Sequence, residues 1–329
     1  MPHVTLDEIE RVVLAALLEH GADAFPAAEV ARAVRKAEAH GNRICGLYYL
    51  ESYCQQLRTG RVKGNVSPVV SAPRPAAILV DAQFGFAQPA FAYGLVPALD
   101  AARQFGTATL AIGHAHTCTS LGYFTEQVAR AGFICLGLTN ASPIVAPPGG
   151  KTRVIGTNPI AFSVPDGQGG LAMQFDQSTT TVALGKITMA KAAGTSIPEG
   201  WAVDIDGNPT TDPEAALTGS LVSMGGYKGW GLGLMAEILA AVMTGSTLSQ
   251  DVKPLKAPEG PHHDLGQYYM IIDPSVSDGF ADRLASIAEA ISEDEGARMP
   301  GQGRIESDPV DVPDAVWALA MKLSGLDAS

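Results

Sequence analysis

Residues 139–165 read TNASPIVAPPGGKTRVIGTNPIAFSVP, and residues 171–186, beyond a glycine-rich turn, read LAMQFDQSTTTVALGK. Two short apolar runs, Ile160–Val164 and Leu171–Phe175, lie between clusters of Gly, Pro, Asn and Thr, which predicts two strands. Each predicted strand ends next to small polar residues. Small hydroxyls and backbone amides beside glycines let a ligand approach the main chain closely, which suits a phosphate or a carboxylate. A pair of ordinary hairpin turns is the alternative on composition alone.

The composition argues against several classes of protein. The chain of 329 residues is 46% hydrophobic and 17% charged, as expected of a globular protein with one large domain or two smaller ones. Its net charge of -12 argues against a nucleic-acid partner and against an anionic membrane surface. The N-terminus, MPHVTLDEIE, lacks the apolar region of a signal peptide. The four cysteines have no CxxC spacing, so we expect reduced thiols in a cytoplasmic protein.

Helical and strand patterns alternate along the chain. Residues 5–59 predict three helices, the first beginning with a capping box of Thr5 and Glu8 and the others covering Ala27–His40 and about Leu47–Thr59. After an extended linker at 62–75, strands alternate with helices, which argues for an α/β fold. The predicted helix at 228–244 is apolar on nearly all sides, which predicts that it is buried. The remaining predicted elements are strands at 76–80, 107–112, 133–139 and 268–272, helices at 93–105, 122–131, 228–244, 279–292 and 312–323, and a surface loop at 194–218.

The sequence contains no conventional nucleotide-binding motif. Gly229, Gly231 and Gly233 do not follow GxGxxG spacing, and no Walker A loop occurs. Taken alone, this absence argues against a dinucleotide enzyme. A metal site is not expected either, because His114 and His116 share one face of a predicted strand but have no third ligand near them in the sequence.

Several short motifs, taken in their order and spacing, resemble one family over nearly the whole chain. They are LRTGR at 57–61, GTNP at 156–159, ALGK at 183–186, IPEGW at 197–201, GGYKG at 225–229 and MPG at 299–301. The family is the malate/L-lactate dehydrogenase type that does not use the usual Rossmann domain. It includes ureidoglycolate and sulfolactate dehydrogenases and reductases of cyclic imines such as piperideine- and pyrroline-2-carboxylate.

The resemblance implies a fold, a cofactor and an assembly. The fold is α/β, with a non-Rossmann nicotinamide-binding sheet domain at 76–284. A helical domain is formed by residues 1–75 and joined by the C-terminal segment 285–329. The implied cofactor is NADP or NAD, the implied partner is a small-molecule substrate, and the implied assembly is a homodimer.

The resemblance also implies a Ser-His-Gly triplet whose His donates a proton to the substrate, with an Arg four residues later that holds a carboxylate. A gap-free alignment places Ile44-Cys45-Gly46 on the triplet and Tyr49 on the Arg, so this chain departs from the family at both positions. The alternative takes His40, followed by Arg43, as the triplet. That alignment would lengthen the segment up to Leu57 by five residues, which is more than one helical turn.

Cys45 has two interpretations at the donor position. A thiol can act as a general acid or base, or as a nucleophile if a neighbour such as Arg43 lowers its pKa. Alternatively, Cys45 is a small buried hydrophobic residue in a site that has lost its protonation role.

A third departure lies at position 184. The family usually has an Arg there that faces the substrate, and this chain has Leu184 followed by Gly185 and Lys186. In the cyclic-imine reductases position 186 is acidic and completes a proton relay, whereas many malate-type members have Lys. The resemblance thus gives Cys45, Lys186 and His40 as catalytic candidates. The substrate-binding candidates are Arg43, Tyr49, Thr157, Leu184 and Gly185.

The cofactor positions of the family are better preserved. Lys228 and Arg304 could meet phosphates as a point charge and a planar fork, respectively. The family's cofactor-binding His falls on Thr117, one residue after His116. The full set of expected cofactor-binding residues is His116, Thr117, Thr139, Asn140, Asp176, Gln177, Ser178, Lys228, Gly229, Arg298, Pro300, Gly301 and Arg304.

We therefore expect an NAD(P)-dependent oxidoreductase that transfers a hydride between nicotinamide and a small 2-oxo or 2-hydroxy acid or a cyclic imino acid. The loss of two arginines indicates a different or less anionic substrate anchor. An imine can reach the hydride step already protonated, which relaxes the need for a His donor. The alternative is a family member that binds the cofactor but has lost its chemistry, or that catalyses a non-redox reaction such as a Cys45-based elimination.

Overall fold

The computed structural model describes residues 1–257 and 259–326, and its centre is a seven-stranded mixed sheet. Only β3 and β4 pair in parallel, and all other neighbours are antiparallel. The expected α/β class is therefore confirmed, and residues 62–75, expected to be a linker, contribute the edge strand β2. In spatial order the strands are β2 (Val69–Arg74), β3 (Ala77–Asp81), β4 (Thr107–Ala115), β11 (Leu265–Ile272), β5 (Ile134–Thr139), β6 (Ile160–Pro165) and β7 (Leu171–Gln177).

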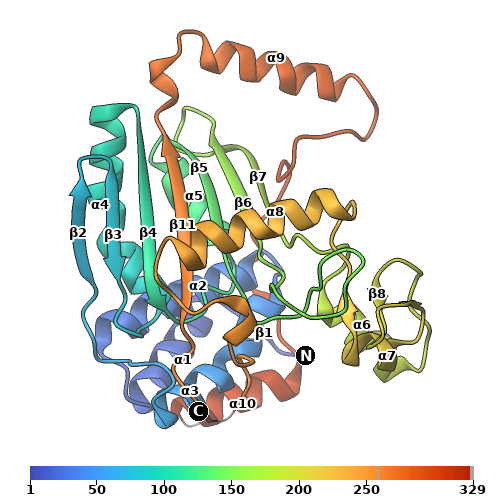
Figure 1. The fold of residues 1–329 in the computed structure, drawn as a ribbon. Coiled ribbons are helices and arrows are strands. Elements are labelled where there is room, and N and C mark those ends of the chain that lie inside the picture. Colours follow the sequence, from blue (N-terminus) through green and yellow to red (C-terminus); the bar gives the residue numbers. More distant parts are fainter. Residues whose placement is uncertain (258, 327–329) are drawn as a thin grey trace.

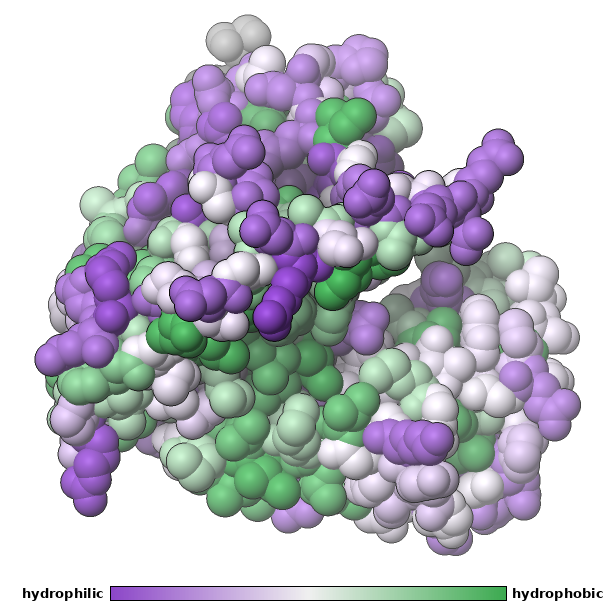
Figure 2. Space-filling model, turned by 90° about the horizontal axis from the view of Figure 1, so that it is seen from above, coloured by the Kyte–Doolittle hydropathy of each residue, from purple (hydrophilic) through white to green (hydrophobic). Residues whose placement is uncertain are grey.

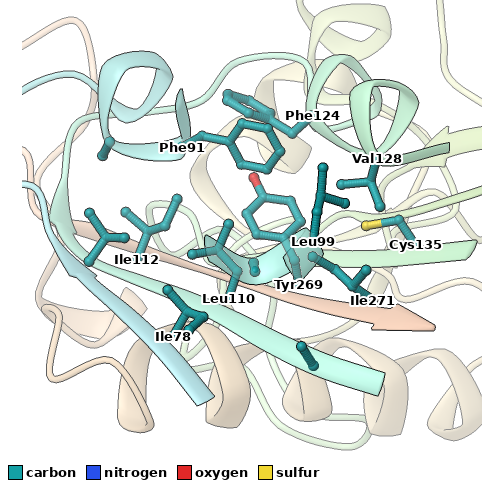
Figure 3. Close-up of a cluster of buried hydrophobic side chains, with 14 of the residues drawn as sticks. Ile78, Phe91, Leu99, Leu110, Ile112, Phe124, Val128, Cys135, Tyr269 and Ile271 are labelled. Carbon is teal, nitrogen blue, oxygen red and sulfur yellow. The ribbon is translucent and has the colours of Figure 1, made fainter. Parts of the chain in front are cut away.

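Helices cover both faces of this sheet. On one face, α4 (Ala87–Phe105) and α5 (Gly122–Arg130) pack on the strands, where Phe91 and Phe124 meet Tyr269 of β11 (Figure 3). On the other face lies a long helix made of α8 (Tyr227–Glu237) and a π-helical turn (Ile238–Val242), which crosses in front of the strands in Figure 1.

A helical layer packs below the sheet and joins the two ends of the chain (Figure 1). A single buried cluster unites α1 (Leu6–Glu19), α2 (Ala24–Ala39), α3 (Leu50–Thr59) and α10 (Asp314–Ser324). The predicted capping box is confirmed, because the Thr5 side chain accepts from the Glu8 N–H and the Glu8 carboxylate accepts from the Thr5 N–H. Strand β1 (His3–Val4) pairs with β12 (Val310–Asp311) at the same end.

Residues 194–218, which we expected to be a surface loop, form part of a small lobe with its own core. Its elements are α6 (Leu184–Ala193), β8 (Ala202–Val203), β9 (Pro209–Thr210), α7 (Pro213–Thr218) and β10 (Ser220–Leu221). Buried Ile187, Ile197 and Leu221 share one cluster, so this region has an apolar core despite its Pro, Asp and Gly content. The Pro, Asp and Gly residues do mark turns, but the strands that these turns connect, β8, β9 and β10, are each only two residues long.

The helix at 228–244 is only half buried, contrary to its apolar sequence. Its inner face packs on the sheet, whereas Leu234, Ile238 and Val242 remain 39, 46 and 58% exposed. Figure 2 looks down on the molecule from the α9 side and shows hydrophobic side chains gathered in a broad patch along one flank. Helix α9 (Phe280–Ser292) projects beyond the sheet and contains no fully buried residue (Figure 1).

The remaining elements are short 3-10 turns at Arg43–Cys45, Leu47–Tyr49, Ser249–Asp251 and Pro274–Val276. Within residues 1–257 and 259–326, none of the helices combines the length and the apolar character that crossing a bilayer requires.

Candidate functional site

The site begins at the 3-10 turn Arg43–Cys45, directly after the end of α2 at Ala39. Gly46 follows Cys45, and a side chain at position 46 would collide with the buried Glu38 carboxylate. Burial, and to a lesser extent the negative charge of Asp176, raises the pKa of the Cys45 thiol to about 12. The thiol therefore keeps its proton at neutral pH, and the thiolate that a nucleophile needs is disfavoured.

Asp176 is the penultimate residue of β7, and its charge acts on this thiol from the sheet. Its Oδ2 accepts the Gly122 N–H at 2.8 Å, at the start of α5, and the Ser120 hydroxyl at 3.2 Å. Burial raises the pKa of Asp176, while these hydrogen bonds and the charge of Arg304 oppose that change. Asp176 is thus a carboxylate in a fixed orientation, at the junction of helical layer and sheet.

His40 reaches the same place from the end of α2. A cavity of about 60 Å³ is lined by His40, Asn42, Asp176 and Arg304, among others. The His40 Nε2 lies 3.3 Å from a Glu306 carboxylate oxygen. Burial lowers the pKa of His40, and the neighbouring charge of Lys36 lowers it further. Both donor candidates, Cys45 and His40, therefore lie near Asp176.

The first turn of α6 closes the opposite side of the Cys45 turn. The Ile44 Cδ1 lies 3.7 Å from where a Cβ of Gly185 would be, so the two segments are in contact. Lys186 is exposed on this turn and lies in a helix, not at a strand end. Leu184 is 37% exposed, which leaves an apolar side chain where the resemblance implied a cation.

Among the other substrate candidates, only Arg43 carries a positive charge. Tyr49 packs against Tyr53 with ring centroids 6.2 Å apart, and burial raises the pKa of Tyr49 to about 12. Its hydroxyl is therefore neutral. Arg43 lies near Glu38, whose pKa is raised by burial and lowered by the Arg43 charge. The Thr157 carbonyl accepts from the Thr179 N–H and hydroxyl, both at 2.9 Å, which fixes this turn beside the end of β7.

The N-terminus of α8 has the features of a phosphate cradle. Gly225 and Gly226 both adopt positive φ, +61° and +62°, and bring the chain sharply into the helix. Lys228 is exposed on the first turn of α8. The N–H groups at positions 227–229 come before the first N–H that bonds within the helix, that of Trp230, so they have no partner inside it. A Cβ at Gly229 would lie 1.9 Å from the Met224 carbonyl oxygen, so only glycine permits this close approach.

The segment 298–304 runs along β7, the open edge of the sheet. The Gln174 N–H donates to the Pro300 carbonyl at 2.9 Å, and Arg304 Nη1 donates to Gln174 Oε1 at 3.1 Å. Gly301 has φ +81° and lies against the Gln174 backbone. Arg298 is exposed nearby. A cavity of about 580 Å³ lies between this segment, β7 and α9, and its lining includes His40 and Arg304.

Three of the expected cofactor residues have side chains that are already engaged in hydrogen bonds within the protein. Thr139 donates to the Gly266 carbonyl at 2.8 Å, and Asn140 bridges Gly266 and Thr247. His116 is fully buried, and its Nε2 lies 2.7 Å from Gln56 Oε1. The neighbouring Thr117 is half-exposed. The structure therefore presents position 117 to the outside, and His116 does not face a cofactor cleft.

The next two expected cofactor residues are Gln177, the last residue of β7, and Ser178, directly after it. Gln177 is exposed, and the Ser178 hydroxyl lies 2.9 Å from the Thr180 hydroxyl. Among residues 1–257 and 259–326, no group of three His, Cys, Asp or Glu side chains is arranged to hold a metal ion.

Sequence reasoning missed a buried carboxylate that ties the site together. Glu237 of α8 accepts from Asn158 Nδ2 at 2.8 Å and from the Ser249 N–H at 2.7 Å. Asn158 is fully buried with φ +35°, next to Thr157. The only sequence signal was a lone acidic residue in an apolar helix, which indicates a buried and paired charge.

Comparison with known proteins relates this chain to one family of enzymes. The sequence profile described as malate/L-lactate dehydrogenase matches residues 4–309. The chain is 39% identical over 319 residues, 95% of each chain, to (2R)-3-sulfolactate dehydrogenase (NADP(+)) of Chromohalobacter salexigens. It is 34% identical over 326 residues to a Δ1-pyrroline-2-carboxylate/Δ1-piperideine-2-carboxylate reductase of Pseudomonas putida, covering 98% of this chain and 95% of the relative. The crystal structure of Δ1-piperideine-2-carboxylate reductase from Pseudomonas syringae superposes with a TM-score of 0.87 at 30% identity, over 98% of this chain and 100% of that one.

Proposed function

Because this chain belongs to the malate/L-lactate dehydrogenase family, we propose that its active site lies where Cys45, Asp176 and the first turn of α6 come together. The chain is an NAD(P)-dependent oxidoreductase that transfers a hydride between nicotinamide and a small 2-oxo or 2-hydroxy acid or a cyclic imino acid. The observation that carries the placement is the convergence of three separate segments: the turn after α2, the end of β7 and the start of α6.

The residues around the proposed active site fit a nicotinamide cofactor. When bound, the cofactor supplies or accepts the hydride. The N-terminus of α8 with Lys228 would hold phosphate, because its first N–H groups are available and Gly225 and Gly226 open the approach. Asp176 would orient a hydroxyl-bearing group. We propose NADP over NAD for two reasons. Arg298 and Arg304 add positive charge beside β7, and the sulfolactate dehydrogenase relative is named for NADP(+).

The Cys45 thiol is the proton donor in this proposal. Its high pKa keeps it protonated, so it can give its proton to the oxygen that becomes a strongly basic alkoxide when a 2-oxo acid is reduced. A cyclic imine can arrive already protonated on nitrogen and needs no such donor. The same pKa removes support for the alternative of a Cys45-based elimination, which requires a thiolate.

A second copy of the chain covers the apolar face of α8 in this proposal. Exposed Tyr227, Leu234, Ile238, Val242 and Met243 form a face that a monomer would leave in water. A homodimer is the commonest way to bury such a face. We also propose that the molecule works in the cytoplasm, because Cys45, Cys54, Cys118 and Cys135 are all unpaired thiols.

The proposal keeps the expected division of the chain into a helical domain of 1–75 with a C-terminal segment and an α/β domain of 76–284. Its support is that residues from both ends share one buried cluster. The C-terminal members of that cluster begin at Val310, inside the expected C-terminal segment 285–329.

The test is oxidation of NADPH and NADH with 2-oxo acids and cyclic imino acids, comparing the parent with Cys45→Ala and His40→Ala. We expect turnover with NADPH. We expect Cys45→Ala to lower kcat for 2-oxo acids at least about tenfold, and to leave cyclic imines within about twofold. Loss of turnover only in His40→Ala would reassign the donor to His40. A parent that binds cofactor but turns over nothing would support the non-redox alternative.

A further inference from the structure

Lys256 is a cation held on aromatic rings beside the 3-10 turn that follows Cys45. Its Nζ lies 3.7 Å from the ring centroid of Tyr48 and 5.9 Å from that of Tyr49. Both rings face the ammonium group from the 3-10 turn just after Cys45. No ion pair joins Lys256 to a carboxylate in the part of the chain that the structure describes. Aromatic faces attract the charge without neutralising it, so the ammonium group can still pair with an anion.

A buried arginine fixes the loop that carries Lys256. Arg61 is 1% exposed, and its guanidinium donates only to main-chain carbonyls. Nη1 donates to Pro254 and Leu255 at 3.3 Å and to Ala257 at 2.6 Å, while Nε donates to Pro261 at 3.1 Å. Burying this charge without a carboxylate is costly, and burial lowers the pKa of Arg61. In return, the hydrogen bonds from Arg61 fix the backbone on both sides of position 256.

The position of Lys256 relative to Cys45 follows from its aromatic partners. Tyr49 and Cys45 are close enough that a charge on the thiol would raise the pKa of Tyr49. Ile44, next to Cys45, contacts Gly185 at the start of α6. The side chains at 49 and 184 are neutral. Lys256 therefore places a positive charge next to Tyr49, a neutral side chain where the resemblance implied an Arg.

Other cations near the turn are less suited to this role. Arg43 and Lys186 are both exposed, and neither lies over an aromatic ring in the described part of the chain. Their long side chains are therefore less restricted than that of Lys256. The named substrates of relatives, sulfolactate and pyrroline-2-carboxylate, carry carboxylate or sulfonate groups that need a positive partner.

We propose that Lys256, held over Tyr48 and Tyr49 by the Arg61-anchored loop, binds the anionic group of the substrate. This inference rests on the proposed function and adds the residue that determines specificity for a carboxylate or sulfonate. A lysine contributes a point charge without the planar fork of an arginine, so it accepts either anion. The anion is bound alike before and during hydride transfer, so the effect falls on KM and leaves kcat nearly unchanged.

The test compares Lys256→Ala with Lys253→Ala, which removes an exposed lysine on the same loop. Steady-state kinetics would use a 2-oxo acid and its neutral primary amide with NADPH. We expect Lys256→Ala to raise KM for the acid at least about tenfold, with kcat within about twofold and no change for the amide. Lys253→Ala should match the parent. Tyr48→Leu, which removes the aromatic support and keeps the charge, should raise KM for the acid about threefold.

A KM for the acid that stays at the parent value in Lys256→Ala, or that rises only in Lys186→Ala, overturns the inference. Calorimetric binding of oxamate, a non-reacting carboxylate, to the NADP-loaded protein gives a readout that needs no turnover. If the parent binds oxamate and Lys256→Ala does not, the inference stands even when the parent reduces nothing, and only the proposed function fails. If the parent and Lys256→Ala bind oxamate equally, the inference is wrong whatever the turnover.

Discussion

At the scale of single residues, this protein keeps several charged or titratable groups uncharged by burying them. The Cys45 thiol and the Tyr49 hydroxyl both have pKa values raised to about 12, and burial is the main cause in each. Arg61 stays charged at similar depth only because main-chain carbonyls replace water around it. The candidate site thus combines neutral proton carriers with a scaffolded cation, Lys256, beside the turn that follows Cys45.

His263 gives a pH prediction at the same scale. Burial and the Arg61 charge lower the pKa of His263 to about 4, below its ordinary value of about 6.5. Between these values the unfolded chain binds more protons than the folded one, so this residue makes stability rise with pH across that window. We expect the parent to lose about 2–3 kcal/mol relative to His263→Gln as pH falls from 6.5 to 4.

The measurement is urea unfolding of both proteins at pH 4, 5, 6 and 7, because only the difference between them isolates His263. Glu29 and Glu38 have raised pKa values and contribute in the opposite direction in both proteins. A difference that is flat with pH would show that His263 titrates normally in the folded state.

At the scale of elements, the position of the α8 helix depends on glycines where it crosses the strands. A Cβ at Gly266 of β11 would lie 1.6 Å from the Ala240 carbonyl oxygen, inside the π-helical turn. The two backbones therefore touch, and Thr244 donates back to the same carbonyl. Glu237 completes the attachment by tying α8 to Asn158 and Ser249. The helix carrying Lys228 is thus held at three points.

Gly266→Ala should be strongly destabilising. The new methyl group meets backbone that cannot rotate away, so we expect a loss of roughly 3 kcal/mol or more in the free energy of unfolding. Gly231→Ala on the outer face of α8 is the matched control, because nothing lies within 4 Å of its Cβ position. We expect it to gain up to about 1 kcal/mol from helix propensity. Equal unfolding midpoints for the two variants would contradict this account of the crossing.

At the scale of the whole molecule, two helices extend apolar surface away from the core. The outer face of α8 keeps Ile238 and Val242 about half exposed, and α9 stands clear of the sheet with Ile287 55% exposed. Lys228, a proposed cofactor contact, is on the same helix as the apolar face. Dimerisation through this face would therefore place the interface on the helix that carries Lys228.

Ile238→Glu combined with Val242→Glu should convert the proposed homodimer into monomer. Burying two carboxylates in an apolar interface without partners costs several kcal/mol, more than a typical dimer can lose at micromolar concentration. The measurement is mass by size-exclusion chromatography with light scattering. Ile205→Glu in the small lobe, 66% exposed, is the control and should leave the mass unchanged. A parent that runs as a monomer would remove the basis for this interface.

The sequence by itself determined the family, the α/β class and the order of most elements. Motifs such as GTNP at 156–159 and the periodicity of residues 5–59 are local, because each is written in neighbouring residues, and the structure confirms the helices and strands that they predicted. The departures at Cys45, Tyr49 and Leu184 could also be read from the chain, since alignment needs only order and spacing.

Only the tertiary structure decided which side chains face the site and which are consumed by packing. His116 was one residue from the expected position, yet it is sealed in the core against Gln56. Lys256 had no signal of its own, because its importance comes from Tyr48 and Arg61, about 200 residues away. The all-round apolarity of α8 did not show that one face would remain open. Exposure and charge pairing depend on contacts between distant segments, which local sequence patterns do not encode.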